Sequence, residues 1–259
     1  MKKVNVISHR GANFFAPQNT LPAFKKAIEL NVDGFETDVH LTKDGVPVLC
    51  HNYTVNATSD NKGSITNYTL EEIKKLDFGS YFSASYADTP IPTVEEFLEL
   101  FSKSNVKILN IELKSPKDKT ETEIVRKTID LVRSFGLIDN LLISSFNPAL
   151  LVEAKEYEPG CKTGLLYSPD KRVAWTIAKD PVKYAKNIGA DALHPHELYV
   201  SRNYIERAHA EGLIVNTWTI NKPKTIEKML NWGADGIITN HPDLVHHFIK
   251  MMEEREQLD

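Results

Sequence analysis

The stretch Gly34-Phe-Glu-Thr-Asp-Val-His-Leu-Thr-Lys-Asp-Gly-Val-Pro-Val-Leu-Cys-His-Asn52 carries the pattern that decides the fold. Its first part alternates in the manner of a β-strand, Asp44-Gly45 is a typical turn sequence, and an apolar segment follows the turn. Because side chains alternate between the two faces of a strand, Glu36 and Asp38 share one face, and apolar packing takes the other. The stretch therefore predicts a hairpin whose first strand presents two carboxylates.

The carboxylate pair has two interpretations. A Glu-x-Asp pair by itself is typical of a solvated edge strand. Two carboxylates held close together repel each other and raise each other's pKa unless a cation lies between them, and such hard oxygen ligands suit Mg2+ or Ca2+. His51, which lies on the returning strand, favours the second interpretation, a functional site that binds a cation.

Length and composition bound the class of protein. A chain of 259 residues fits either two ordinary domains or one α/β barrel, which typically needs about 250 residues. The hydrophobic content of 41% is sufficient for a core. The formal net charge of −4 gives no basic excess that would hold nucleic acid, so we expect no nucleic-acid partner.

We expect no targeting segment and no membrane-spanning segment. The apolar run that follows Lys2-Lys3 is shorter than the ~7–15 residues of a signal peptide core, and no later run is long enough to span a membrane. Cys50 and Cys161 lack the spacing of a metal site, which predicts buried free thiols in a reducing compartment. The expected location is the cytoplasm, and the sequence does not predict the oligomeric state.

Strand and helix patterns alternate along the chain. The expected strands are residues 4–7, 34–39, 107–113, 141–145, 162–167, 191–194, 213–218 and 236–239. The expected helices between and after them are residues 19–30, 93–101, 121–135, 148–156, 181–188, 203–210, 224–231 and a last helix from Asp243. This tally predicts an α/β fold, a single (β/α)8 TIM barrel domain over residues 1–259. A doubly wound open sheet would alternate in the same way, but it usually has a glycine-rich turn where His9-Arg10-Gly11 stands here.

The connection after the hairpin is longer than a crossover requires. Residues 70–76 have the pattern of a short helix, and Thr93 with Glu96 has the spacing of a capping box for the helix through Phe101. We interpret residues 53–90 as an insertion that caps the barrel mouth. Its aromatic residues fit either a satellite core or the wall of a substrate cleft, and they are Phe78, Tyr81, Phe82 and Tyr86.

Chemically active residues gather at the predicted carboxyl ends of the strands, where barrel enzymes place their catalytic groups. In chain order they are His9, Arg10, Glu36, Asp38, Asn110, Glu112, Lys114, His194, His196 and Trp218. Alternation puts Glu112 and Lys114 on one face, so a third carboxylate and an ammonium group point into the barrel mouth. Three carboxylates around one divalent ion leave a net charge near −1. Arg10 and Lys114 could offset that charge and bind an anionic substrate.

Short motifs in a fixed order cover essentially the whole chain. They are His9-Arg10-Gly11, Pro17-Gln18-Asn19-Thr20, Glu36-x-Asp38, Asp44-Gly45, His51, Ile91-Pro92-Thr93, Glu112-x-Lys114, Trp218-Thr-Ile-Asn221 and Gly233-Ala-Asp-Gly-Ile-Ile-Thr239. Together they resemble the glycerophosphodiester phosphodiesterase family. The resemblance implies a metal-dependent barrel enzyme that hydrolyses glycerophosphodiesters to sn-glycerol 3-phosphate and an alcohol.

The resemblance also implies roles for single residues. In that family the positions that match Glu36, Asp38 and Glu112 bind the metal. The positions that match His9 and His51 serve as acid and base. The positions that match Arg10 and Lys114 contact the phosphate, and the position that matches Trp218 packs near the glycerol. The family analogy suggests the 2-hydroxyl of the substrate as nucleophile, through a cyclic phosphate. The implied cofactor is one divalent cation, and the implied partner is a small-molecule diester.

Three positions depart from the family pattern. Gln18, Asn52 and Asn240 stand where the family has Glu, Asp and often Asp. Each exchange removes a carboxylate and keeps a similar shape. The loss beside His51 matters most, because a neighbouring carboxylate could raise the pKa of the imidazole or orient it, and the expected pH optimum changes without it.

Some residues keep two interpretations. His194 and His196 share a strand face near the mouth and fit either a site or loop packing, and we count His196 among the candidates for substrate binding. Trp218 fits either the barrel core or a substrate wall. We expect His40 to be an exposed hairpin residue.

Two other functions compete with the diesterase. A phospholipase-D-like enzyme that cleaves lysophospholipids would need a large apolar groove, and the polar segment 52–67 argues against one. A non-catalytic phosphoester-binding barrel would keep Arg10 and Lys114 but would have no need of paired histidines. The preferred head group and the assignment of acid and base to His9 and His51 do not follow from the sequence.

Overall fold

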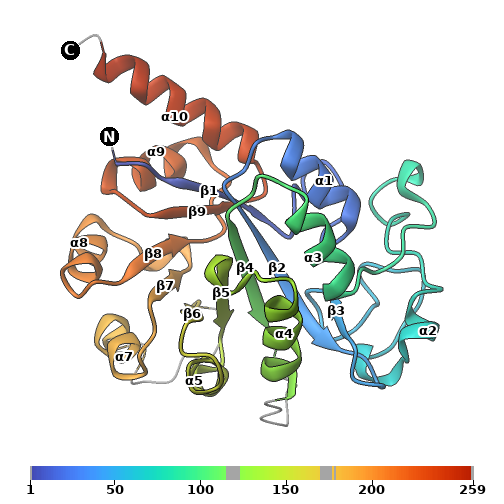
Figure 1. Cartoon of the computed structure of the whole chain (residues 1–259). Helices are drawn as coiled ribbons and strands as arrows, with labels where there is room; N and C mark the ends of the chain where they lie inside the picture. Colours follow the sequence, from blue (N-terminus) through green and yellow to red (C-terminus); the bar gives the residue numbers. More distant parts are fainter. Residues whose placement is uncertain (1, 115–122, 170–176, 178, 258–259) are drawn as a thin grey trace.

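The computed structural model describes residues 2–114, 123–169, 177 and 179–257 (Figure 1). Its strands are β1 (Asn5–His9), β2 (Gly34–Leu41), β3 (Pro47–Leu49), β4 (Ile108–Leu113), β5 (Leu141–Ser145), β6 (Lys162–Tyr167), β7 (Ala192–Pro195), β8 (Ile214–Thr217) and β9 (Gly236–Thr239). The sheet order is β1-β9-β8-β7-β6-β5-β4-β2-β3, and a further pairing of β1 with β2 closes it. All of these pairings are parallel except that of β3, which runs back along β2. The predicted (β/α)8 barrel is therefore confirmed.

Helices surround the closed sheet (Figure 1). They are α1 (Leu21–Glu29), α2 (Leu70–Ile73), α3 (Val94–Ser102), α4 (Glu123–Ser134), α5 (Pro148–Tyr157), α7 (Pro181–Asn187), α8 (Arg202–Ala210), α9 (Pro223–Trp232) and α10 (Pro242–Glu256). Several begin with proline, whose fixed φ and missing N–H suit the first turn. The predicted capping box of α3 is confirmed, because Thr93 accepts from the backbone of Glu96 and Glu96 accepts from the backbone of Thr93. None of the described helices is long and apolar enough to cross a membrane.

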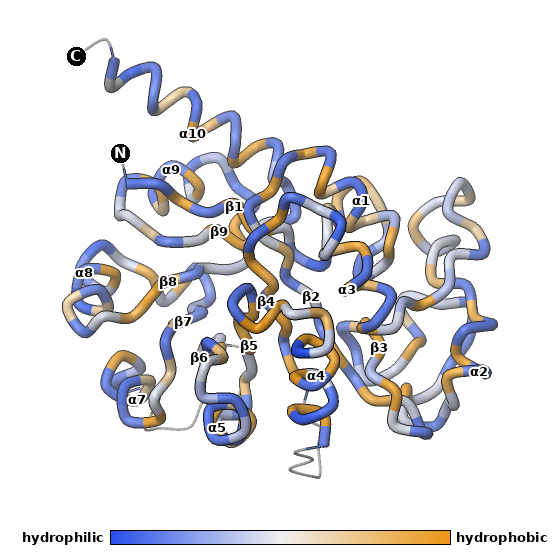
Figure 2. Tube along the Cα trace, viewed as in Figure 1, coloured by the Kyte–Doolittle hydropathy of each residue, from blue (hydrophilic) through white to orange (hydrophobic). Residues whose placement is uncertain are grey.

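The apolar core lies between the outer face of the barrel and the helices. Figure 2 shows hydrophobic residues along the strands and on the helix faces toward them. Phe35 of β2 packs against Phe24 of α1 and Phe97 of α3, with ring centroids 5.3 Å and 5.9 Å away. Such aromatic contacts add to the free energy of burial. Because Phe35 points outward, alternation sends Glu36 into the barrel, as predicted.

Residues 53–90 form a unit with its own small core. This satellite core joins the hairpin to the insertion and consists of Val48, Cys50, Val55, Ile65, Ile73, Leu76, Phe78 and Ile91. Phe78 therefore belongs to the satellite core, one of the two interpretations given for these aromatic residues. Tyr81 and Phe82 are partly exposed. The Tyr86 hydroxyl donates to the Phe15 carbonyl at 3.1 Å, which ties the insertion to the loop after β1. Its function as a cap over the mouth stays a prediction.

The two cysteines are buried and carry free thiols, as predicted. Burial raises the pKa of both thiols to about 11. Neither thiol is therefore a reactive thiolate near neutral pH.

Three aspartates hold neighbouring strands together at the end of the barrel opposite the predicted site. Asp33, Asp191 and Asp235 each stand directly before a strand. Their carboxylates accept backbone N–H bonds from Val6 at 2.9 Å, Thr163 at 2.7 Å and Val215 at 2.8 Å, all on the preceding parallel strand. The repeated position of Asp before a strand therefore has a structural cause, the pairing of parallel strands at their amino ends.

Asp235 gives a test of these bonds. Burial alone would raise the pKa of its carboxyl, but bonds from Lys2, the Val215 N–H and His209 outweigh burial and lower it. We expect Asp235→Ala to reduce the free energy of unfolding by about 1–3 kcal/mol at pH 7, the usual range for a hydrogen bond to a charged group. A lowered folded-state pKa means that this contribution is present above the unfolded value of about 3.9 and is lost as the pH falls through the folded value. Urea denaturation between pH 7 and pH 3 should therefore show a shrinking difference between the variant and the wild type.

The matched control is Asp139→Ala, an exposed aspartate outside this set. It should change the free energy of unfolding by less than about 0.5 kcal/mol. A deficit of Asp235→Ala that stayed constant down to pH 3 would show that the charge of the carboxylate does not stabilise the fold.

Candidate active site

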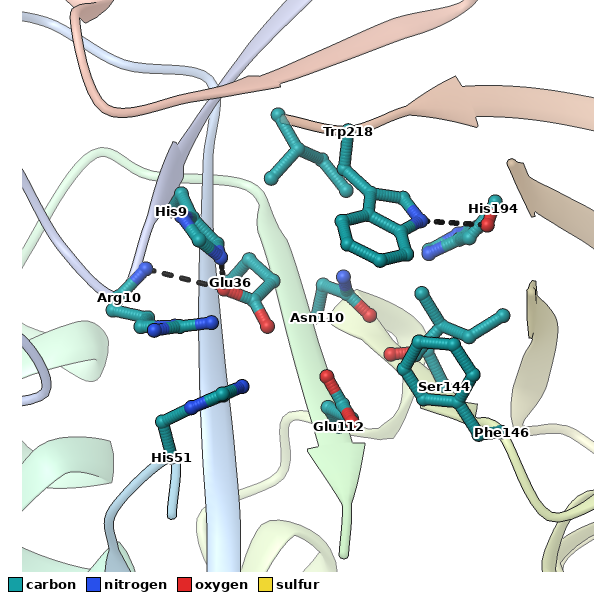
Figure 3. Close-up of a pocket in the computed structure, with 12 residues that line it drawn as sticks. His9, Arg10, Glu36, His51, Asn110, Glu112, Ser144, Phe146, His194 and Trp218 are labelled. Atoms are coloured by element: carbon teal, nitrogen blue, oxygen red, sulfur yellow. Dashed lines mark hydrogen bonds and ion pairs between the residues drawn. The ribbon is translucent and has the colours of Figure 1, made fainter. Parts of the chain in front are cut away.

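A cavity of about 210 Å³ lies at the carboxyl ends of the barrel strands. Six of the predicted site residues line it: His9, Arg10, Glu36, His51, Glu112 and Trp218. Figure 3 shows His9, Arg10 and His51 on one side of Glu36 and Glu112, and Trp218 and Phe146 on the other. Asp38 and Lys114 are buried and form ion pairs with two of these residues, Asp38 with Arg10 and Lys114 with Glu112. The structure thus brings together eight of the nine residues that the sequence selects.

Glu36, Asp38 and Glu112 form a buried acidic triad. Each offers one carboxylate oxygen, and these three atoms lie within 4.8 Å of one another. The register explains why, since Asp38 on β2 stands directly opposite Glu112 on β4, and Glu36 precedes Asp38 on the same face. An all-oxygen set of this kind fits a hard divalent cation such as Mg2+ or Ca2+.

Two cations already face the triad from within the chain. Lys114 Nζ lies 2.7 Å from Asp38 Oδ1 and 2.5 Å from Glu112 Oε1, and Arg10 Nε lies 3.1 Å from Asp38 Oδ2. Burial alone would raise the pKa of Asp38, but Lys114 and Arg10 outweigh it and hold that pKa well below its usual range. Burial alone would lower the pKa of Lys114, but Asp38 and Glu112 outweigh it and raise that pKa. Both groups are therefore charged at neutral pH.

Glu36 differs from Asp38 in its environment. Its carboxylate accepts the Arg10 backbone N–H at 3.1 Å. Burial and then the negative charge of Asp38 raise the pKa of Glu36 well above its usual value. A divalent cation held by the triad would offset both effects. The residues present therefore fit a bound divalent cation.

Asn19 fixes the orientation of Asp38. Its side-chain N–H donates to Asp38 Oδ2 at 2.9 Å, and its side-chain oxygen accepts the Thr37 hydroxyl at 2.8 Å. The backbone N–H of Asn19 donates to the Arg10 carbonyl at 2.9 Å. Asn19 has φ of 56°, a left-handed conformation that asparagine tolerates better than most residues. The Pro17-Gln18-Asn19-Thr20 motif thus supports the acidic triad, a role that we did not predict.

The two histidines are held in the same way. His9 Nδ1 lies 2.7 Å from Asn240 Oδ1, and His51 Nδ1 lies 2.8 Å from Asn52 Oδ1. An amide oxygen can only accept, so in each ring Nδ1 carries the proton and Nε2 is left with its lone pair. Nε2 of His9 lies 3.9 Å from Glu36 Oε2. Asn240 and Asn52 therefore orient the two rings through uncharged amide oxygens.

Both imidazoles are neutral at pH 7. Burial and the neighbouring Arg10 guanidinium lower the pKa of His9 to about 3. Burial lowers the pKa of His51 to about 4, and the charges of Lys114 and Arg10 add to the effect against the opposing charge of Asp38. A neutral imidazole with a free Nε2 is the form that accepts a proton as a general base.

His40 is buried, which contradicts the prediction of an exposed hairpin residue. Strand β2 continues beyond the predicted boundary to Leu41, so His40 stands on the same face as Glu36 and Asp38. Its Nε2 lies 3.4 Å from the His51 carbonyl oxygen, and its ring meets Tyr53 edge to face at 5.0 Å. The segment that follows β3 therefore covers the His40 side chain, which the hairpin by itself would leave exposed.

Trp218 and His196 lie at the mouth on the opposite side. Trp218 lines the cavity, donates from Nε1 to the His194 carbonyl at 2.7 Å and meets Phe146 edge to face. His196 does not line the cavity. It accepts the Leu198 N–H at 3.3 Å through Nδ1, and its ring meets that of Trp218 edge to face at 5.3 Å. The placement of Trp218 agrees with a substrate wall, and that of His196 agrees with loop packing behind it. Their roles stay predictions.

Ser144 and Phe146 also line the cavity, and the sequence did not lead us to either. Ser144 stands opposite Glu112 in the register of β5 with β4. Predicting Ser144 would have required this register, because a serine near a strand end is not by itself indicative of a functional site.

Comparison with known proteins shows similarity to one enzyme family. Residues 9–244 match the family model described as "Glycerophosphoryl diester phosphodiesterase family". The chain is 36% identical to the glycerophosphodiester phosphodiesterase of Caldanaerobacter subterraneus subsp. tengcongensis, covering 96% of this chain and 98% of that relative. It is 32% identical to the glycerophosphodiester phosphodiesterase of Bacillus altitudinis, covering 96% and 98% of the two chains.

Solved structures agree with the sequence relatives. An Oleispira antarctica phosphodiesterase in complex with the product sn-glycerol-3-phosphate superposes with a TM-score of 0.86 at 31% identity, covering 95% of this chain and 96% of that one. A putative glycerophosphoryl diester phosphodiesterase from Silicibacter pomeroyi DSS-3 gives a TM-score of 0.86 at 28% identity, covering 96% and 94%.

The acidic triad predicts that a divalent cation stabilises the fold. A ligand that binds only the folded state at 100 times its dissociation constant raises the free energy of unfolding by about 2.7 kcal/mol. We expect Mg2+ or Ca2+ to raise the melting temperature of the wild type but not that of Glu36→Gln or Glu112→Gln. Without cation, both variants should stay folded, because each removes negative charge from a crowded buried site. Differential scanning calorimetry with and without chelator measures both effects.

The control for this comparison is Glu227→Gln, an exposed position on α9. It should keep the full response to the cation. Equal stabilisation of the wild type and both triad variants would place the cation elsewhere in the chain.

Proposed function

Because the chain belongs to the glycerophosphoryl diester phosphodiesterase family, we propose that it releases sn-glycerol 3-phosphate and an alcohol with the help of one divalent cation and two histidines. As a member of that family it is a phosphoric diester hydrolase, so the non-catalytic barrel is not retained. The observation that supports the mechanism most is the convergence of the acidic triad, Arg10, His9 and His51 on one cavity.

The acidic triad is the proposed cation site, with Mg2+ or Ca2+ as the cation. When bound, that ion supplies electrostatic stabilisation of negative charge on the phosphoryl oxygens. Among the described residues, three carboxylates face the two cations Arg10 and Lys114, which leaves one excess negative charge in the described part of the site. A divalent cation reverses that excess to one positive charge, and a phosphodiester monoanion brings it to zero. Charge balance therefore favours a monoanionic phosphodiester as the ligand of this site.

Arg10 is the proposed phosphate ligand at the cavity surface. Its Nε faces Asp38, and its Nη1 donates to Gln18 Oε1 at 2.7 Å. Gln18 stands where the family usually has Glu, so the partner at Nη1 is neutral here. The guanidinium keeps more of its positive charge for an anionic ligand as a result. Lys114 lies deeper and is proposed to assist through its charge.

His9 and His51 are the proposed proton-transfer groups. One accepts a proton from the nucleophile at its free Nε2, and the other, which must first take up a proton from solvent at Nε2, donates that proton to the leaving alkoxide. Their Nδ1–H groups are held by Asn240 and Asn52, so each ring offers Nε2 for transfer. Both line the same cavity, in Figure 3 on the same side of Glu36 and Glu112.

The direct test is the release of glycerol 3-phosphate from a panel of diesters. The purified chain with Mg2+ or Ca2+ should hydrolyse glycerophosphocholine, glycerophosphoethanolamine or a related water-soluble diester, and exhaustive chelation should abolish turnover. Glu112→Gln should be folded and nearly inactive, since it removes one arm of the acidic triad. A lysophospholipid belongs in the panel because the apolar side chains of Phe14 and Leu198 are exposed in the segments that follow β1 and β7. Full activity after chelation would contradict the metal-dependent mechanism.

The histidines are tested by changing the leaving group. General acid catalysis typically contributes about 10²–10⁴ in rate, and the benefit shrinks when the leaving group is already a good one. Of His9→Ala and His51→Ala, we expect one to recover much of its loss in kcat on a nitrophenyl diester, while the other stays slow on every substrate because it lacks the base. Steady-state kinetics on one alkyl and one aryl diester measure the split. Equal losses of both variants on both substrates would contradict separate acid and base roles.

A further inference from the structure

Residues 77–89 of the insertion form a compact loop, the tyrosine loop, which carries Tyr81 and Tyr86. The two ends of the loop are tied together, because the Phe78 N–H donates to the Thr89 carbonyl at 2.7 Å. Phe78 is buried in the satellite core of the insertion and anchors the loop there. The tyrosine loop is therefore attached to a core of its own, outside the barrel.

The backbone directly before Tyr81 is held by hydrogen bonds and by one close approach. The Asp77 carboxylate accepts the N–H groups of Gly79 at 2.7 Å and Ser80 at 3.2 Å. The Ser80 hydroxyl and then these backbone bonds lower the pKa of Asp77 to about 2, so the carboxylate is charged at neutral pH. A Cβ at Gly79 would overlap the carbonyl oxygen of Tyr86, so the loop closes this tightly only with glycine. The position of Tyr81 is thus fixed from within its own loop.

Both tyrosine hydroxyls bind the backbone of the segment that follows β1. The Tyr81 hydroxyl oxygen accepts the Gln18 N–H at 3.0 Å, and the Tyr86 hydroxyl donates to the Phe15 carbonyl at 3.1 Å. Burial raises the pKa of Tyr81, although bonds from Gln18 and the charge of Arg10 oppose this effect. The tyrosine loop therefore holds residues 15–18 at both of their ends.

Gln18 connects the Tyr81 contact to Arg10. Its side-chain oxygen accepts from Arg10 Nη1 at 2.7 Å. The next residue, Asn19, donates its backbone N–H to the Arg10 carbonyl at 2.9 Å. The guanidinium and the backbone of Arg10 are thus both bound by the two residues that follow the Gln18 N–H. A shift of the Gln18 backbone would move the partners of Arg10 with it.

Arg10 requires support because its backbone is strained. Its φ of 56° lies in the left-handed region, which costs a residue with a Cβ roughly 1–2 kcal/mol. Such conformations persist where the surrounding contacts over-determine them, and they are common at functional sites. The bonds from Tyr81 and Tyr86 are contacts of this kind, since they join the segment after β1 to a separate core.

We propose that Tyr81 is a positioning residue for Arg10, which fixes the Gln18 backbone and thereby directs the guanidinium toward the phosphate. This inference rests on the proposed function, in which Arg10 is the phosphate ligand. Tyr81 is not among the described residues that line the cavity, so it acts through Gln18 and not by touching the substrate. The insertion then supports the active site from the side, through the segment that follows β1.

The test is a double-mutant cycle between Tyr81 and Arg10. The affinity for sn-glycerol 3-phosphate is measured by isothermal titration calorimetry, with Ca2+ present, for the wild type, Tyr81→Phe, Arg10→Ala and the double variant. We expect Tyr81→Phe to weaken binding about 2- to 10-fold, the usual effect of one neutral hydrogen bond. In the Arg10→Ala background the same substitution should leave the affinity unchanged, because the group that Tyr81 positions is absent.

Turnover gives a second readout. On glycerophosphocholine, Tyr81→Phe should raise KM by a similar factor and change kcat little, because the phosphate is bound both before and during the reaction. A fall in kcat at unchanged KM would contradict a role in phosphate binding.

The matched control is Tyr68→Phe, the same substitution within the same insertion. It removes a hydroxyl that donates to the Lys62 carbonyl at 2.7 Å, a bond that does not leave the insertion. The control should keep the wild-type affinity and KM. All variants are compared at a temperature where far-UV circular dichroism shows each of them folded, so that a change in affinity does not reflect unfolding.

Several results would overturn the inference. They are an equal loss of affinity from Tyr81→Phe in both backgrounds, no loss in either, or the same loss from Tyr68→Phe. The proposed function fails in a different way, because then Arg10→Ala would bind sn-glycerol 3-phosphate as tightly as the wild type, or the wild type would hydrolyse no diester. Weaker binding by Arg10→Ala without coupling to Tyr81 would leave Arg10 as the phosphate ligand and overturn only the positioning role of Tyr81.

Discussion

The buried carboxylate of Asp38 is the group on which the site depends. It has no exposed surface, and it is bound by Lys114 through Oδ1 and by Arg10 and Asn19 through Oδ2. A buried charge that lost its partners would cost several kcal/mol, roughly 3–5 by comparison with broken buried ion pairs. Lys114 comes from the end of β4, and Arg10 and Asn19 come from the loop between β1 and α1. The pairing of one carboxylate therefore fixes the loop after β1 and the mouth of β4 relative to β2.

The sequence predicts the barrel and most of this site because both depend on short-range periodicity. Alternation along β2 and β4 places Glu36 with Asp38 and Glu112 with Lys114, and the strand tally places both pairs at one end of the barrel. The residues that the sequence analysis missed or misplaced depend on contacts between segments that are distant in the sequence. Ser144 is found only through the register of β5 with β4, and the burial of His40 depends on a segment that follows β3. Asn19 is conspicuous in sequence only as part of a motif, because its contact with Asp38 requires a left-handed backbone that spacing does not reveal.

The departures from the family pattern gain a physical meaning in the structure. Asn240 and Asn52 each accept from Nδ1 of a histidine, so the amide keeps the tautomer and ring orientation that a carboxylate would fix. What the amides do not supply is negative charge. The local charges at His9 and His51 therefore come mainly from Arg10, Lys114 and the acidic triad. Gln18 likewise accepts a hydrogen bond from Arg10 without adding a negative charge that would offset the guanidinium. The three amides thus hold their partners without adding negative charge to the site.

The cavity then divides into two halves that differ in charge. On the side of His9, Arg10 and the acidic triad, the proposed binding of a phosphodiester and of a cation is electrostatic. On the side of Asn110, Ser144 and His194, the described groups are neutral, because burial lowers the pKa of His194 to about 3, so contacts there depend on hydrogen-bond geometry and on space. A barrel can combine both because adjacent strands enter the same cavity in fixed register, and two glycines on β6 and β9 leave room for the neutral half without weakening the charged half.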